Sequence, residues 1–382
     1  MFMKVLPRIL YKTLKNNIYK GKVLVLYGAR RTGKTTLVRQ LVEEAGEDAR
    51  YINCELQENK DLLESTNSLM LNDFVDTKRL MVFDEAQHIP NMGMILKVLV
   101  DTFPSVQFIA TGSSSFELAD KVSEPLTGRS RTYMLLPFSL EEMRALHPLV
   151  ELKAMLPSFI RFGMYPQVVL SSNADKEEEL SEIASSYLYR DVLQFEQVKR
   201  PELIEKLLQA MALQLGSESS LNELAQITGS NVHTVKRYIE LLEKSFVVFR
   251  LRSFSRNLRK EIAKSQKVYF YDTGIRNAII RNHNPLHLRT DVGGLWENFC
   301  ISERLKFNEF NRRKVNSFFW RTYDQKEIDF IEEKDGVLYC FEFKYNSKSS
   351  GRLPKEFAQS YAEVRFKTIT PENFYELFSE DF

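Results

Sequence analysis

The chain has few cysteines and no long apolar runs, which are the features typical of disulfide-bonded extracellular proteins and of membrane proteins. Its 382 residues include three cysteines, Cys54, Cys300 and Cys340, whose wide spacing matches no disulfide or metal-binding pattern. That usage fits the reducing cytosol. No segment approaches the ~20 consecutive apolar residues of a membrane-spanning helix, and the first residues lack the long apolar core of a signal peptide. We therefore expect a cytoplasmic protein with no membrane partner.

The chain also lacks an excess of either charge. Its 53 lysines and arginines nearly balance 51 aspartates and glutamates, which leaves a net charge of +2. This excludes a general attraction to nucleic acid or membranes, so only local patches could bind them. Histidines are few, and His283 and His287 have no third ligand nearby, while Pro285 breaks the helix that their spacing would need. We expect a loop there rather than a zinc site.

A glycine-rich segment carries the most informative pattern. Residues 28–35 read GARRTGKT directly after an apolar run, which is the phosphate-binding pattern G-x-x-x-x-G-K-[ST]. Gly28 and Gly33 let the backbone turn and point its N–H groups at phosphate oxygens. Lys34 can reach the β- and γ-phosphates, and the Thr35 hydroxyl can ligate Mg²⁺. The expected nucleotide contacts are Gly28, Arg31, Thr32, Gly33, Lys34, Thr35, Thr36 and Ser113.

Two later strands would end beside this loop. Residues 79–85 form an apolar run that ends in Asp84 and Glu85, about fifty residues after the loop, which favours a magnesium-holding Asp84 and a water-polarising Glu85 over two solvated acids. The next run ends near Thr111 and Ser113. These are candidate sensors of the γ-phosphate, although a serine-rich turn between a strand and a helix explains them equally well.

The order of elements predicts an α/β fold. Strands and helices alternate through residues 22–27, 35–45, 49–53, 79–84, 93–102 and 106–111. This alternation predicts a parallel sheet with helices on both faces. Residues 139–215 carry helical spacing throughout, which indicates a helical lid and connecting helices.

Residues 216–284 have the outline of a winged helix. A capping box at Ser220 and Glu223 opens one helix, Asn231 caps a second, and two strands follow at 246–251 and 267–271. The segment between these strands is basic, with residues Arg252, Arg256, Arg259, Lys260 and Lys264. Two interpretations stay open: binding to the DNA backbone, and a structural spacer or interface.

The last hundred residues contain a second candidate site. A hairpin is predicted around Asp335–Gly336, and pairing Glu332 with Val337 would put Glu327, Asp329, Glu342 and Lys344 on one face. Diagonal neighbours on such a face are about 7–8 Å apart, close enough for Asp329 and Glu342 to share a metal ion. Charged residues on a solvated strand face are the alternative.

Several segments together resemble a known family. They are residues 28–35, 80–87, 110–115, 126–129, 135–139, 187–191 and 294–298. The chain is similar to AAA-type ATPases, and more narrowly to a group of uncharacterised prokaryotic ATPases in which a P-loop domain precedes a winged helix and a nuclease-like domain. The string Asp84-Glu85-Ala86-Gln87-His88 also resembles a helicase box, but no later arginine-rich helicase motif follows.

The resemblance implies further roles. It makes Arg129 an arginine finger across a subunit interface, with Arg131 as a rival, so a homo-oligomer is expected. It likens the C-terminal hairpin to a PD-(D/E)XK nuclease, with Asp329 and Glu342 as metal ligands, Lys344 as the catalytic lysine and Glu297 as the helical acid.

These expectations give a concrete arrangement. We expect a P-loop NTPase parallel sheet with helical lid, a winged helix and an α/β nuclease-like domain, over residues 1–138, 139–215, 216–284 and 285–382. The predicted function is Mg²⁺-dependent ATP hydrolysis coupled to DNA binding or processing. The alternative is a nucleotide-dependent switch whose degenerate nuclease domain serves protein interaction or signalling.

Overall fold

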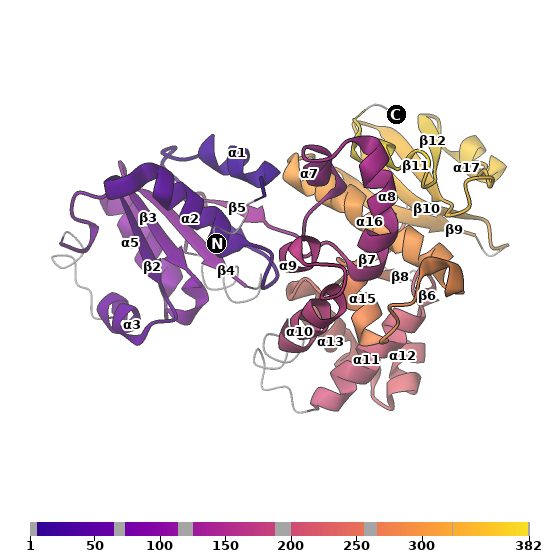
Figure 1. Cartoon of the computed structure of the whole chain (residues 1–382), viewed down its shortest axis with the longest axis horizontal. Helices are drawn as coiled ribbons and strands as arrows, with labels where there is room; N and C mark the ends of the chain where they lie inside the picture. The colour runs from indigo at the N-terminus through magenta and orange to yellow at the C-terminus, as the bar shows by residue number, and fades with distance from the viewer. Residues whose placement is uncertain are drawn as a thin grey trace. The chain divides into compact units, whose positions relative to one another are not determined.

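The chain folds into two compact units. The computed structural model describes residues 6–64, 73–113, 125–187, 200–255, 266–322 and 324–380. The first unit comprises residues 1–136 with 244–246, and the second comprises 137–243 and 247–382 (Figure 1). The basic segment 256–264, Ser114 and Ser115, and most of the segment 187–191 lie outside the described residues.

The first unit contains a five-stranded parallel sheet in the order β2-β3-β4-β1-β5. Its strands are β1 (Val23–Tyr27), β2 (Ala49–Asn53), β3 (Leu80–Asp84), β4 (Gln107–Gly112) and β5 (Ser130–Met134). Its helices include α1 (Ile9–Lys15), α2 (Lys34–Ala45), α3 (Gln57–Glu64) and α5 (Met92–Thr102). The sheet predicted from the alternating pattern is confirmed, and β5 is an additional edge strand beside β1.

Apolar residues cover both faces of this sheet, because successive strand residues point to opposite sides. Val23 and Val25 pack in a core that includes residues of α5, whereas Leu24 and Leu26 pack in a core with residues of α1 and α2. Each such fully buried side chain contributes roughly 1.5–3 kcal/mol. The sheet therefore holds the carboxyl ends of β1, β3 and β4 at one rigid edge.

The second unit begins with the expected run of helices. They are α7 (Leu140–Arg144), α8 (Leu149–Phe162), α9 (Pro166–Leu170), α10 (Lys176–Tyr187) and α11 (Pro201–Leu213). The next pair, α12 (Leu221–Thr228) and α13 (Val232–Lys244), lies where two helices of a helix-turn-helix were predicted. Ser220 caps α12 by accepting from the N–H of Glu223, which is half of the predicted capping box, whereas the Glu223 side chain accepts from Gln214. The turn passes through Gly229 in the left-handed conformation.

A seven-stranded sheet joins the rest of this unit, in the order β12-β11-β10-β9-β7-β8-β6. Its strands are β6 (Glu218–Ser219), β7 (Val248–Ser253), β8 (Gln266–Phe270), β9 (Asn316–Arg321), β10 (Glu327–Lys334), β11 (Val337–Phe343) and β12 (Val364–Ile369). Parallel pairing of β7 with β9 puts the strands expected in the winged helix into the same sheet as the C-terminal hairpin. The division expected at residues 284 and 285 therefore crosses one continuous sheet.

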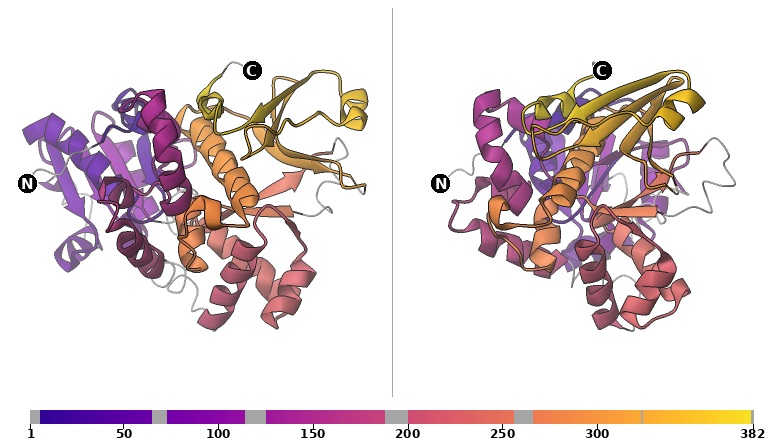
Figure 2. Two further views of the ribbon diagram at one scale, coloured as in Figure 1. Left: turned by 45° about the vertical axis from the view of Figure 1, so that its right-hand side comes forward. Right: turned by 90° about the vertical axis from the view of Figure 1, so that its right-hand side faces the viewer.

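One long helix supports this sheet and carries buried charge. Helix α16 (Val292–Phe310) contacts β8 and β11, and runs beside the strands in both views of Figure 2. Its Glu303 accepts from the N–H of Leu140 at 2.6 Å and from Lys306 at 2.6 Å, and Lys306 also donates to the carbonyl of Phe138 at 2.9 Å. Two buried charges of α16 thus fix the first residues of the second unit.

Within the described part of the chain, no helix is both long and apolar enough to cross a membrane. The cytoplasmic location stays a prediction.

Candidate functional site

The glycine-rich loop joins β1 to α2 and has two positions that require glycine. A Cβ on Gly28 would lie 2.1 Å from the carbonyl oxygen of Leu135, so only glycine allows this close approach of two backbones. Gly33 has a φ of 97° immediately before the first turn of α2. Arg31 is exposed and left-handed, with a φ of 60°. The loop therefore has the conformation that the sequence pattern predicts.

Side chains within the loop bind its own carbonyl groups. The Lys34 ammonium is buried and donates to the carbonyls of Gly28 at 2.8 Å and Ala29 at 3.0 Å. The Thr32 hydroxyl donates to the carbonyl of Ala29 at 2.8 Å, while Thr36 is exposed on the first turn of α2. Lys34 is thus held at the loop, where a phosphate oxygen could replace the carbonyls.

Arg8, which belongs to no recognisable sequence motif, bridges this loop to the end of the first unit. Arg8 donates from Nη1 to the carbonyl of Thr32 at 2.8 Å and from Nη2 to the carbonyl of Leu136 at 2.6 Å. Leu136 is the last residue of the first unit before Pro137. One guanidinium therefore binds both the phosphate loop, at Thr32, and the last residue of the first unit, Leu136.

The Asp84 carboxylate is surrounded by hydroxyl donors. Thr35 donates to its Oδ2 at 2.8 Å, Tyr51 donates to the same oxygen at 2.5 Å, and Thr111 donates to Oδ1 at 2.5 Å. Burial and the neighbouring Asp84 raise the pKa of Tyr51 to about 12, so its hydroxyl keeps its proton. The guanidinium of Arg39 lies over the Tyr51 ring. The predicted pair of Thr35 and Asp84 is brought together, and Tyr51 is a neighbour from β2 that no sequence motif indicated.

Glu85 follows β3 in a left-handed conformation with a φ of 54°. Its N–H donates to the Thr111 hydroxyl at 3.0 Å. Its Oε2 accepts from Gln87 at 2.6 Å, and the same amide nitrogen of Gln87 donates to the Ser113 hydroxyl at 3.2 Å. The two candidate sensors, Thr111 and Ser113, therefore both connect to Glu85.

The candidate arginine finger, Arg129, lies at the amino ends of the strands, whereas the phosphate loop lies at their carboxyl ends. The carbonyl of Arg129 accepts from the N–H of Val23, at the start of β1, whereas the phosphate loop begins after the end of β1, about 13 Å further along the strand. Arg129 forms a half-exposed ion pair with Asp101 at 2.7 Å, and Arg131 donates to Asn17. Neither arginine reaches the loop within one chain, so a finger across a subunit interface stays a prediction.

The hairpin of β10 and β11 has a different register from the expected one. Lys334, rather than Glu332, pairs with Val337, because the turn consists of only two residues, Asp335 and Gly336, both with positive φ. In addition, β10 has a β-bulge against β9 between Ile328 and Ile331, and both isoleucines pack in the same core, so the strict alternation of faces that was expected around Asp329 is wrong. The Asp329 Oδ2 accepts from the N–H of Phe343 at 2.7 Å.

Burial is the largest cause of a raised pKa at two carboxyl groups in this part of the second unit, Asp329 and Glu297. Burial, then the charges of Glu297 and Glu342, raises the pKa of Asp329 well above its usual value. Burial also raises the pKa of Glu297. Lys344 pairs with Glu342 at 2.6 Å, and this pairing outweighs burial to raise the pKa of Lys344. The predicted residues Asp329, Glu342, Lys344 and Glu297 are therefore close together.

A buried lysine from β8 completes this group of charges. Lys267 is 1% exposed and pairs with Glu297 at 3.2 Å and with Glu327. Burial disfavours its charge, but the two carboxylates outweigh burial and raise the pKa of Lys267. The Tyr269 hydroxyl donates to Glu297 at 2.5 Å. Sequence reasoning missed Lys267 because it assigned β8 to a separate domain.

No set of three or more histidines, cysteines, aspartates or glutamates among the described residues is arranged to hold a metal ion. A metal ion at Asp329 and Glu342 would therefore depend on these two ligands and on water, an arrangement that Mg²⁺ commonly accepts.

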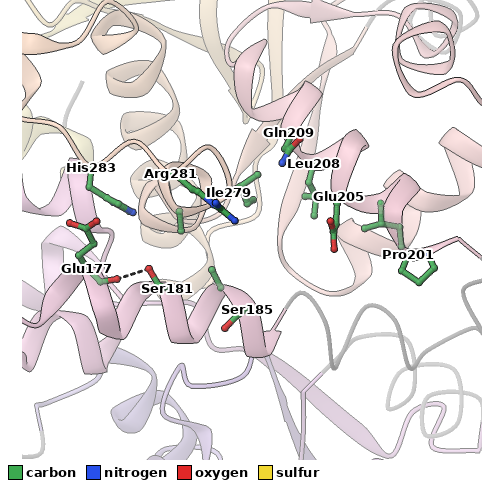
Figure 3. Close-up of a pocket in the computed structure, with 13 residues that line it drawn as sticks. Glu177, Ser181, Ser185, Pro201, Glu205, Leu208, Gln209, Ile279, Arg281 and His283 are labelled. Carbon is green, nitrogen blue, oxygen red and sulfur yellow. Dashed lines mark hydrogen bonds between the residues drawn. The ribbon is translucent and has the colours of Figure 1, made fainter.

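The second unit also contains a pocket of about 420 Å³ among α10, α11 and the residues after α15 (Thr273–Ile279). Figure 3 shows Glu177 beside His283 on one side, and Glu205 and Gln209 on α11. Burial lowers the pKa of His283, so its ring is neutral near pH 7. The lining contains two acids, Glu177 and Glu205, and one cation, Arg281, so its net charge is negative. A negative lining does not suit a phosphate group.

Comparison with known families supports the assignment of the first unit. Residues 20–144 match the family model described as an AAA domain, which spans the phosphate loop, Asp84 and all five strands. This match and the parallel sheet support an AAA-type P-loop ATPase fold for the first unit. Residues 154–286 and 292–373 match two domains of unknown function, DUF8612 and DUF4143.

Uncharacterised relatives match this chain over most of its length. An uncharacterised protein of Mycobacterium tuberculosis is 26% identical over 341 residues, covering 88% of this chain and 73% of that protein. One of Methanocaldococcus jannaschii is 25% identical over 403 residues, covering 95% and 84%. A Walker-type ATPase of Pyrococcus abyssi has a similar fold, with a TM-score of 0.50 and 16% identity over 72% of this chain and 96% of that one. The winged helix and the nuclease-like domain are not confirmed by these similarities.

Proposed function

We propose that this chain binds ATP with Mg²⁺ and hydrolyses it at the carboxyl edge of the first sheet. The observation that carries this proposal is the 2.8 Å hydrogen bond between Thr35, on the phosphate-loop helix, and Asp84, at the end of β3. It brings the two expected magnesium-holding groups together, with Glu85 directly beside them. The match to an AAA domain supports the same conclusion.

The residues suggest a division of roles. The donor set of one hydroxyl and one carboxylate suits a hard cation, so Thr35 would hold Mg²⁺ directly and Asp84 through water. Bound Mg²⁺ would neutralise charge on the β- and γ-phosphates. Lys34 would exchange its two carbonyl partners for phosphate oxygens, and the loop N–H groups would bind the others. Glu85 would polarise the attacking water.

Substitution of Glu85 by glutamine tests this proposal directly. We expect Glu85→Gln to bind ATP with wild-type affinity but to hydrolyse it about 10²–10⁴-fold more slowly, because only the group that polarises water is lost. Glu43→Gln, an exposed acid on α2, is the matched control and should hydrolyse ATP normally. Equal turnover by Glu85→Gln and wild type would exclude the assigned role.

The second sheet supports a second candidate function, a metal-dependent nuclease. The carboxylates of Asp329, Glu342 and Glu297 are close enough to raise the pKa of Asp329, and a divalent cation would relieve their repulsion. Wild type should then cut or nick DNA in Mn²⁺, whereas Asp329→Asn should not, with ATP hydrolysis unchanged. If calorimetry of the full chain finds no binding of Mn²⁺ that depends on Asp329, the acids serve structure alone.

DNA is the partner that we propose for the helix-turn-helix. Helix α13 exposes Lys236 and Arg237, and cations on such a helix contact phosphates in other proteins of this geometry. Duplex or single-stranded DNA should then increase ATP turnover, and Lys236→Glu with Arg237→Glu should remove the increase. Unchanged turnover in DNA would favour the alternative, a nucleotide-dependent switch whose C-terminal half binds proteins.

A further inference from the structure

We infer that Gln87 is a positioning residue for ATP hydrolysis, which orients Glu85 and ties its carboxylate to Ser113. The inference rests on the proposed ATPase function and deepens it. Hydrolysis would depend on three linked side chains, Glu85, Gln87 and Ser113, at the ends of two neighbouring strands, rather than on Glu85 alone.

The geometry of the amide group carries the inference. The Gln87 Nε2 donates to Glu85 Oε2 at 2.6 Å and to Ser113 Oγ at 3.2 Å, and the residue is 8% exposed. The reverse orientation of the amide would place two acceptor oxygens against each other, because an ionised carboxylate only accepts. Both N–H bonds of Gln87 are therefore committed to Glu85 and Ser113.

The backbone of Glu85 is held in a conformation that lets its carboxylate accept from Gln87. Glu85 is in the left-handed conformation, which is strained and uncommon for residues other than glycine. The Thr111 hydroxyl accepts the N–H of Glu85 at 3.0 Å and itself donates to Asp84 at 2.5 Å. Strand β4 thus holds the backbone of Glu85 through Thr111 and the carboxylate through Ser113 and Gln87.

The carbonyl of Gln87 provides a second, independent observation. Its Oε1 is buried and has no hydrogen-bond partner among the described residues. Buried acceptors are nearly always paired, so an unpaired one at a functional site indicates a ligand that donates. This oxygen has no surface open to water in the structure, so a water polarised by Glu85 could donate its second hydrogen here only after the Gln87 amide turns toward the site. Water-orienting amides have this role in other nucleotide hydrolases.

The test compares the full chain with Gln87→Met, which keeps the size of the side chain and removes the amide. We expect kcat for ATP to fall about 10–100-fold with KM and ATP affinity within about twofold of wild type, because orientation of the water matters only in the transition state. Ser113→Ala should lower kcat less. The double variant should be no slower than Gln87→Met, because Ser113 acts through Gln87.

A matched control separates catalysis from folding. Gln107 is also buried in β4, and its amide donates to the carbonyls of Lys22 and Phe108 at the far end of the sheet. Gln107→Met should lower the unfolding temperature and leave kcat unchanged. If Gln87→Met does not fold, Gln87→Glu serves instead, since a second carboxylate against Glu85 should reduce kcat by a similar factor.

The outcomes distinguish this inference from the proposed function. A kcat for Gln87→Met within twofold of an active wild type, or an equal change in KM, would overturn the role of Gln87 alone. Wild-type protein without Mg²⁺-dependent turnover would overturn the proposed function, and this inference with it.

Discussion

Each of the two sheets of this protein holds a buried aspartate, but the two aspartates have different surroundings. At the edge of the first sheet, the single carboxylate of Asp84 accepts from the hydroxyls of Thr35, Tyr51 and Thr111. On the second sheet, Asp329 lies among other acids, and the nearby cations are lysines.

The difference indicates which ligands can bind at the surroundings of Asp84, the first region, and at the surroundings of Asp329, the second region. Hydroxyl groups are neutral and can rotate, so the first region can exchange partners for a ligand without leaving an uncompensated charge. Lys267 and Lys344 already neutralise the second region in part, so a metal ion there must compete with ammonium groups. Removing one partner of such a buried pair is costly, which makes that region more resistant to change.

The largest expected effect separates the two regions. Lys34→Ala should abolish ATP binding and lower turnover at least about 100-fold, because no other side chain of the loop supplies a cation to the phosphates from that position. The second region should be unaffected, so any Mn²⁺ binding that depends on Asp329 should persist. Isothermal titration with ATP and with Mn²⁺ checks both. Lys12→Ala, an exposed lysine of α1, is the control. Loss of Mn²⁺ binding in Lys34→Ala would contradict the separation of the two regions.

The next prediction asks whether the first region is complete within one chain. If Arg129 acts across a subunit interface, Arg129→Ala should lower turnover at least about tenfold and remove its dependence on protein concentration. Asp101→Ala breaks the same exposed ion pair and should leave turnover normal, since such pairs contribute only about 0–1 kcal/mol. Equal effects of the two variants would assign Arg129 a structural role.

A third prediction concerns the crowded acids. Because the native pKa of Asp329 is raised, the folded chain holds this proton more tightly than the unfolded chain, whose aspartate has a pKa of about 3.9. The stability that this group contributes is therefore present at low pH. It is lost as the pH rises from the unfolded-state pKa of Asp329 through its raised native pKa. Asp329→Asn keeps the acceptor for Phe343 and has no proton to lose, so its unfolding temperature should exceed that of wild type at pH 8 and approach it near pH 4.

The exposed turn of the same hairpin supplies the control. Asp335→Asn should follow the wild-type dependence on pH, because asparagine also tolerates the positive φ of that position. If Asp329→Asn also follows the wild-type curve, then the carboxylates are less crowded than their geometry indicates.

The smallest expected effect concerns the hydroxyl donors of the first region. Tyr51→Phe removes one of three donors to Asp84 and should slow turnover about fivefold, equivalent to roughly 1 kcal/mol for one hydrogen bond. The ring and its contact with Arg39 remain, so stability should change little. Magnesium titration of turnover checks the cause, since a loosened Asp84 should raise the Mg²⁺ concentration needed for half-maximal rate. An unchanged magnesium dependence would limit Tyr51 to packing.

Local patterns were enough to predict the first region. Gly28 and Gly33 are required by the backbone itself, and the strand that ends in Asp84 is apolar on both faces, so spacing alone indicated where they meet. Tyr51, Gln87 and Arg8 could not be found in this way, because their contacts join elements that are distant in sequence and no pattern specifies which polar residue will face inward.

The second region was predicted less well for a physical reason. Alternation predicted one shared face for Asp329 and Glu342, but the β-bulge between Ile328 and Ile331 interrupts the alternation of β10 at Asp329, and no local pattern indicated this bulge. The register itself depended on the length of the turn, which is two residues rather than four. The place of Lys267 in this site depends on the pairing of β7 with β9, because that pairing brings β8 into the sheet of the hairpin. It is a parallel contact between strands more than sixty residues apart, which no local pattern predicts.

The two hydrogen bonds of Arg8 have a mechanical consequence. One guanidinium holds both the phosphate loop, at Thr32, and the last residue of the first unit, Leu136. Immediately beyond, Lys306 and Glu303 hold Phe138 and Leu140. A displacement of the phosphate loop at Thr32 would therefore also pull on the backbone of Leu136, because both carbonyls share the same guanidinium within the first unit.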